Sequence, residues 1–288
     1  SSNVKALKHS NSLRAFTLLE LAIVLIIMSV TTTTMFFFLA NSIKNTQKDT
    51  NQQKVDFVVN SINDFYIRTG YIPCPASLTE APSTLNFGVS TVCSSGAVAG
   101  VDDVGTGVDI VRHGMIPVRT IGLPDAAAYD AYGNRIHYTI VRSFGVNAAT
   151  FDSALPTTGA ITVFGYNPTG PTLTNLNVLT APNTIAYVVH SSGQDQNGAV
   201  TFRGTPLTCT SGGPNEYNCD TTYNQFVGSA DISGTFDDIV VWKTRQQLKY
   251  DKIAFFSTSR NADQTYGKIA IFSDTQGAGA PSYGTGAA

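Results

Sequence analysis

The chain has 288 residues and a formal net charge of −2 at pH 7, so it offers no electrostatic footprint for nucleic acid. Only 13% of its residues are charged, against about 25% in typical soluble domains. Gly, Ser, Thr and Asn are plentiful, a composition that is common in exported, loop-rich β proteins.

The first predicted element is an apolar helix between Arg14 and Ala40, within which Glu20 is the only charged residue. From Phe16 to Ala40 it is about 37 Å long at ~1.5 Å per residue, enough to cross a bilayer core of roughly 30 Å. A carboxylate in such a run is costly and indicates a functional role. Basic residues before the run predict that everything after Ala40 lies across the membrane: Lys5, Lys8 and Arg14 precede it, and Lys44 and Lys48 follow.

The stretch from Ala15 to Glu20, with a basic leader before it and an apolar run after it, resembles the processing site of type IV pilins and of the pseudopilins of type II secretion. The resemblance implies that a membrane-embedded prepilin peptidase cuts between Ala15 and Phe16 and methylates the new amine. The family usually has Gly where this chain has Ala15. The retained helix would anchor the subunit and then pack in the core of a filament.

On this resemblance, Glu20 is the fifth mature residue, about one helical turn from the new ammonium group of Phe16. Pairing the Glu20 carboxylate with this amine, or with that of a neighbouring subunit, would offset the desolvation of both charges. We therefore expect Glu20 to act in subunit docking. One alternative is an ordinary signal anchor with Glu20 near the lipid headgroups. A cleavable secretory signal fits less well, because its apolar region is usually about 7–15 residues long.

An amphipathic continuation of the helix is predicted from Asn41 to Thr69. Its apolar residues recur at three- and four-residue steps: Val55, Val58, Val59, Ile62, Phe65 and Tyr66. Gly70 and then Pro73 are expected to end the helix. We expect the apolar stripe to pack on the chain's own sheet, although a coiled-coil partner would also fit it.

An antiparallel sheet is predicted after an irregular region from Tyr71 to about Asp109. Gly133-Asn134 is a tight-turn dipeptide, and alternation from Arg135 to Arg142 predicts a half-buried strand. The stretch from Asp130 to Asn134, placed before a Tyr-bearing strand, resembles the turn that opens the first sheet strand of pseudopilins. Further strands are expected at Ile161–Tyr166, Ile185–His190 and Asp238–Trp242.

The loop after His190, together with the later Asp237-Asp238 pair, resembles the C-terminal half of pseudopilins, where a loop binds calcium. An insertion at about residues 199–236 separates the two parts here. Four side chains would supply the oxygen ligands that calcium prefers: Asp195, Asn197, Asp237 and Asp238. The alternative is that these residues are solvated and cap the strands.

The four cysteines favour two bridges between sequence neighbours, Cys74–Cys93 and Cys209–Cys219, in an oxidising compartment. Each bridge would close a loop and stabilise the folded state by roughly 3 kcal/mol in the chain-entropy model. With four cysteines, the sequence alone allows three pairings. Zinc is disfavoured, because no Cys-x-x-Cys pair is present and the histidines are scattered along the chain.

No catalytic constellation is found in the sequence. The chain contains no Gly-x-Ser-x-Gly elbow and no nucleotide-binding glycine loop. His113, His137 and His190 are interpreted as structural or exposed residues, and Trp242, the sole tryptophan, as a core residue. We therefore expect that the protein is not an enzyme.

The predicted fold is α+β: a long N-terminal helix packed on an antiparallel sheet, with disulfide-bearing loops. Near the C-terminus, Lys252–Ser257 and Lys268–Ser273 are expected to form one more hairpin. The expected segments are a leader (1–15), a transmembrane and filament-core helix (16–40), its amphipathic continuation (41–70), a pilin-like head (71–276) and a Gly/Ala-rich flexible tail (277–288).

The resemblance implies a structural subunit of a type IV pilus or of a type II secretion pseudopilus. The large head with its inserted loop favours a minor subunit. The implied partners are other pilin or pseudopilin subunits, the prepilin peptidase, an assembly platform protein and its ATPase. The implied location is the bacterial inner membrane with a periplasmic head, and then the filament. The alternative is a membrane-tethered periplasmic or surface binding module that never polymerises.

Overall fold

The computed structural model describes residues 18–96, 98–153, 160–166, 173–175, 184–210, 214–229 and 236–258. Several sequence predictions lie outside these residues. They are the leader with its cleavage site at Ala15 and Phe16, the strand at Lys268–Ser273 and the tail at 277–288.

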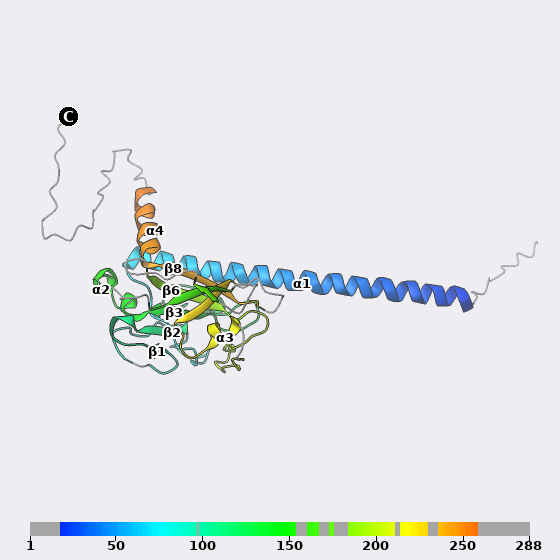
Figure 1. Cartoon of the computed structure of the whole chain (residues 1–288), viewed down its shortest axis with the longest axis horizontal. Coiled ribbons are helices and arrows are strands. Elements are labelled where there is room, and N and C mark those ends of the chain that lie inside the picture. Colours follow the sequence, from blue (N-terminus) through cyan, green and yellow to red (C-terminus); the bar gives the residue numbers. More distant parts are fainter. Residues whose placement is uncertain are drawn as a thin grey trace, which may run out of the picture.

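A single helix, α1 (Leu18–Thr69), forms the longest element, and it confirms the predicted continuous helix. Its first part projects from the rest of the molecule, and its second part lies along the head, which comprises the described residues from Gly70 onward (Figure 1). Five of the six predicted stripe residues are buried, and Phe65 packs at the edge of the core. Gly70, with a φ of 83°, donates its N–H to the Tyr66 carbonyl at 2.7 Å, so the helix ends in a left-handed glycine as predicted.

The central sheet of the head has five antiparallel strands in the order β1-β2-β3-β6-β8. In Figure 1 the labels follow one another away from α1, with β8 nearest the helix and β1 farthest. The bounds are β1 (Asp102–Val104), β2 (Val111–Met115), β3 (His137–Val141), β6 (Ile185–Ser191) and β8 (Ile239–Thr244). The predicted strands at 135–142, 185–190 and 238–242 are thus confirmed, whereas β1 and β2 are not predicted by the sequence.

The prediction that the 135–142 strand is half-buried is wrong, because every residue of β3 is buried. One face of the sheet contacts α1, whose Asn51 donates a hydrogen bond to Ser191 on β6. The opposite face is covered by a second layer, in which Phe226 packs against His190. The alternation of polar and apolar residues along this strand therefore distinguishes two buried faces of the sheet, one that contacts α1 and one that contacts the second layer.

A smaller sheet forms that second layer, with strand order β5-β4-β7. Its strands are β4 (Thr162–Tyr166), β5 (Leu173–Asn175) and β7 (Gln225–Ser229), and β4 pairs with β7 in parallel. The predicted strand at 161–166 is confirmed. The short helix α3 (Pro214–Cys219) and β7 both come from the predicted insertion, which is therefore an integral layer of the head.

The remaining helices in the described part of the chain are α2 (Ala148–Ser153), α4 (Arg245–Thr258) and three 3-10 turns, η1 (Gly107–Asp109), η2 (Asp125–Ala128) and η3 (Arg142–Gly145). Helix α4 contradicts the predicted strand at Lys252–Ser257. Thr244 and Gln247 form a reciprocal capping box, in which each backbone N–H donates to the other side chain, at 2.8 and 3.1 Å. This start signal commits the following residues to a helix.

Two disulfides close the loops of the head, Cys74–Cys93 and Cys209–Cys219, which are the pairs favoured by the sequence. Behind the first bridge, the fully buried Arg112 forms a 2.6 Å ion pair with Asp103. The same guanidinium donates to the carbonyl oxygens of Val92, Ser95 and Gly96. Arg135, also fully buried, donates to the carbonyl oxygens of Leu78 and Glu80, so two buried arginines and one disulfide hold the irregular region after α1.

Candidate functional site

The most unusual surface of the molecule is the apolar arm, residues 18–39 of α1. All of its side chains are exposed, including the bulky Phe38 at 78%. By length and composition, α1 is long and apolar enough to cross a membrane. Glu20 lies on this surface, in the first turn of the helix that the structure describes.

The hydroxyl groups in the middle of the arm are satisfied within the helix. Ser29 and the run Thr31–Thr34 each donate to a backbone carbonyl three or four residues earlier, at 2.6–3.2 Å. A hydroxyl bonded in this way needs no water. The four consecutive threonines are therefore compatible with an apolar environment.

A buried polar network fastens α1 to the head at Asn51, where the exposed first part of the helix ends. Asn51 donates to the Ser191 hydroxyl at 3.0 Å, and Ser191 donates to the Asp130 carboxylate at 2.8 Å. The side-chain oxygen of Asn51 accepts the Ala131 N–H at 3.1 Å. Burial raises the pKa of Asp130, although hydrogen bonds and the Lys54 ammonium act in the opposite direction. We call these three side chains, Asn51, Ser191 and Asp130, the helix clamp.

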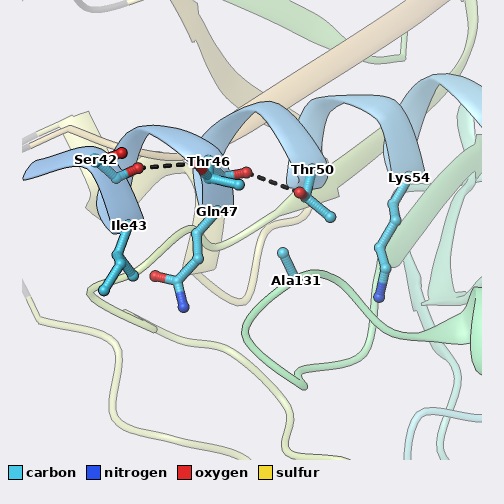
Figure 2. A pocket seen from close by; sticks show the side chains of 7 residues that line it. All are labelled: Ser42, Ile43, Thr46, Gln47, Thr50, Lys54 and Ala131. Atoms are coloured by element: carbon cyan, nitrogen blue, oxygen red, sulfur yellow. Dashed lines mark hydrogen bonds between the residues drawn. The ribbon is translucent and has the colours of Figure 1, made fainter. Parts of the chain in front are cut away.

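A groove of about 310 Å³ runs beside the helix clamp, between α1 and the loop that carries Ala131. Figure 2 shows Ile43, Gln47 and Lys54 projecting from the helix on the side where Ala131 lies. Lys54 donates to the carbonyl oxygens of Tyr129 and Asp130, at 3.2 and 3.0 Å. The lysine thus ties the helix to the turn, and most of the surface that lines the groove is apolar.

A cluster of three carboxylates forms the second candidate site. Asp195, in the loop after β6, and Asp237 and Asp238, before β8, each place an oxygen within 4.8 Å of the other two. Asp237 accepts the backbone N–H groups of Gln194 and Asp195. This loop needs Gly193, which has a φ of 62°, because a methyl group there would lie 2.5 Å from the Asp237 carboxylate.

Two asparagines of α3 complete the acidic cluster. Asn215 donates to Asp195 at 2.6 Å, and Asn218 donates to Asp238 at 2.7 Å. Neither residue could be predicted from the sequence, because only the Cys209–Cys219 bridge, together with the fold, brings α3 to this position. A glance at sequence spacing gives no signal for such a contact.

The cluster has the chemistry of a hard-cation site. Two oxygens bound to one calcium ion at ~2.4 Å lie at most about 4.8 Å apart, which matches the carboxylate separation. One oxygen of Asp237 and one of Asp238 are buried and have no hydrogen-bond partner. Burial raises the pKa of Asp238 to about 8, and the neighbouring carboxylates add to this effect. The three aspartates thus fit the predicted calcium site.

Asn197, the fourth predicted ligand, has a different role. Its side-chain oxygen accepts the backbone N–H of Thr210 at 2.7 Å, beside the Cys209–Cys219 bridge. Its own backbone N–H donates to Asp195. Asn197 therefore connects the acidic loop to the disulfide-bonded segment.

The histidines, which are scattered in the sequence, meet in the folded head. His113, His137 and His190 lie on β2, β3 and β6 and are all buried. The strand register explains this, because His137 is opposite both Met115 and His190, and His113 is two residues from Met115. Their burial agrees with the prediction that they are structural or exposed residues. Their close approach to one another was not predicted.

Comparison of the sequence with protein-family models and with curated proteins, and of the fold with solved structures, yields no match. The class of the protein follows from the chain itself. It combines a helix that is long and apolar enough to span a membrane with an α+β head that contains two disulfides.

Proposed function

We propose that this chain is a subunit of a type IV pilus or of a type II secretion pseudopilus, and that it polymerises through α1. The observation that carries the proposal is the division of α1 into two parts. The second part buries its apolar stripe against the head, whereas the apolar arm leaves every side chain exposed. Such a surface needs an apolar environment, and a bilayer and then the core of a filament provide one in succession.

The sequence motif supports the same proposal. Ala15 to Glu20 has the form of a prepilin processing site, and Glu20 lies at the start of the apolar arm. In this proposal, prepilin peptidase cuts before Phe16 and methylates it. The Glu20 carboxylate then pairs with the terminal amine of a neighbouring subunit in the filament core. A platform protein and an ATPase would drive the extraction of the helix from the inner membrane.

The test is intact-mass and N-terminal peptide mass spectrometry on protein purified from its native membrane. We expect a mature chain that begins with N-methylated Phe16. A mature chain that retains Lys5 to Arg14 would contradict prepilin processing. It would favour instead the membrane-tethered binding module, which needs the anchor but no cleavage.

A further inference from the structure

A cluster of three buried histidines lies between the two layers of the head. His113, His137 and His190 are at most 4% exposed. The ring centroids of His113 and His137 lie 5.1 Å apart, and those of His137 and His190 lie 4.5 Å apart. We call these residues the histidine triad. Three ionisable rings at such distances in a protein interior are costly to charge together.

One segment covers the triad. The ring of Tyr223 stacks on His113, with centroids 3.9 Å apart and planes at 4°. Phe226, on β7, packs against His190 with centroids 5.7 Å apart. Two residues later, a methyl group at Gly228 would fall 2.8 Å from the Trp242 ring, so the backbone of β7 lies directly on that tryptophan. We call residues 214–229, which comprise α3 and β7, the cover.

The hydrogen bonds of the triad suit neutral rings. His113 and His137 share one hydrogen bond, at 3.0 Å between Nε2 and Nδ1. This contact needs one nitrogen that donates and one that accepts. The other nitrogen of His113 meets the Thr139 hydroxyl at 2.7 Å, whereas Nε2 of His137 is buried without a partner. A second proton on the accepting ring would place two donors face to face.

In the described part of the chain, no carboxylate is hydrogen-bonded to the rings of the triad, although the exposed Asp102 lies opposite His113 in the register of β1 and β2. Among the described residues, the titratable groups that face it are its own imidazoles, Tyr223, and the carboxylates Asp102 and Asp220, which lie beside Tyr223. Burial lowers the pKa of His137 to about 4, and burial and mutual repulsion lower the pKa values of His113 and His190 well below their usual range.

We propose that the histidine triad is an acid-operated latch, which holds the cover on the central sheet at neutral pH and releases it in acid. Tyr223 and Phe226 pack directly on His113 and His190, so movement of the cover would admit water to these rings. Protonation therefore acts on this contact before it acts on the α1 side of the sheet. The proposal stands independently of how the chain is assembled.

The direction of the effect follows from proton linkage. The pKa of each imidazole is lower in the covered state than its usual value of about 6.5, so the open state binds more protons below that pH. As the pH falls, the equilibrium constant for opening therefore rises about tenfold per pH unit for each histidine that gains a proton on opening. With all three, the rise approaches about a thousandfold per unit between pH ~6.5 and ~4.

Release of the cover would also open the acidic cluster. Asn215 and Asn218 belong to the cover, and they donate to Asp195 and Asp238. Asn218 in addition accepts the Val227 N–H at 2.8 Å and so holds α3 to β7. The Cys209–Cys219 bridge keeps the released segment tethered. Acidification would thus also free the loops that carry Asp195 and Asp238 from their contacts with α3.

Trp242, the only tryptophan of the chain, provides the probe because β7 lies on its ring. The full chain in detergent micelles would be titrated from pH 8 to 4, with its disulfides intact. Acrylamide quenching of Trp242 reports the cover, and far-UV circular dichroism reports α1 and the sheet. We expect quenching to rise below pH ~6.5 while the circular dichroism is retained. The logarithm of the opening equilibrium constant, plotted against pH, should have a slope that corresponds to the uptake of more than one proton.

Three single variants, His113→Gln, His137→Gln and His190→Gln, test the assignment. Each variant should lower the slope by about one proton. A loss of stability that does not depend on pH would shift the curve but leave its slope unchanged. Tyr223→Phe removes the phenol that stacks on His113 but no imidazole, so this matched control should keep the wild-type slope. Equal slopes in all variants would overturn the latch, as would simultaneous loss of circular dichroism and of Trp242 protection. If a variant fails to fold, a wild-type slope below one proton would still overturn it.

Discussion

Ser191 is the central residue of the helix clamp. Its hydroxyl accepts from Asn51 and donates to Asp130, and all three side chains are buried. A buried polar group that loses its partner costs about 1–3 kcal/mol. We expect Ser191→Ala to lower the free energy of unfolding of the head by that amount, measured by urea titration. Ser61→Ala, whose hydroxyl bonds only its own helix, should change it by less than about 0.5 kcal/mol.

Asp237 tests the acidic cluster at the same scale. If calcium binds to Asp195, Asp237 and Asp238, calcium at ~100 times its Kd stabilises the head by about 2.7 kcal/mol. This corresponds to a rise in Tm of roughly 5–10 °C. The measurement is thermal unfolding in calcium and in a chelator. Asp237→Asn should abolish the rise, while Asp64→Asn, on the exposed face of α1, should retain it. An equal response of both variants would exclude the cluster as the site.

At the scale of the element, the stripe on α1 carries the contact between helix and head. Ile62 is fully buried, whereas Ile43, on the same helix, is 51% exposed. Ile62→Ala leaves a cavity, and we expect a loss of about 2–5 kcal/mol in the free energy of unfolding. Ile43→Ala removes the same atoms from a largely exposed position and should cost far less. Similar losses in both variants would show that the stripe does not hold the head.

The sequence could predict α1 because its signals agree over many residues. Apolar steps of three and four, an uninterrupted apolar run and the stop at Gly70 all point to one helix. Strand β2 could not be predicted, since it carries Arg112 and His113 at buried positions. Their hydrogen-bond partners are distant in the chain: the Val92 carbonyl for Arg112 and the Thr139 hydroxyl for His113.

The errors near the C-terminus and in the insertion have local causes. Lys252–Ser257 has a strand-like composition, but the capping box of Thr244 and Gln247 starts a helix that includes it. The insertion gives no periodic signal for β7, because that strand pairs in parallel with the distant β4. Of the candidate sites, the three aspartates could be predicted from residue type, whereas Asn215, Asn218 and the histidine triad depend on long-range register.

At the scale of the whole molecule, Glu20 separates a filament subunit from a tethered module. A neutral Glu20→Gln side chain keeps the shape of the residue but loses the charge pairing that we propose between subunits. Loss of even about 1.4 kcal/mol per subunit lowers the association constant tenfold. We expect at least a tenfold drop in the protein recovered in sheared filaments, at an unchanged amount in the membrane. Asp49→Asn, on the exposed surface of the same helix, is the matched control. Unchanged recovery with Glu20→Gln would refute the docking role.

The continuity of α1 determines how the molecule bears mechanical load. The helix has 52 residues and is about 78 Å long, and no break separates the apolar arm from the head. Tension applied to the arm therefore reaches the head parallel to the packed stripe, and many contacts must slide together before any of them separates. Beyond Gly70, the chain reaches the Cys74–Cys93 crosslink after a few residues. Force that passes the end of the helix can extend only that short segment before a covalent bond carries it.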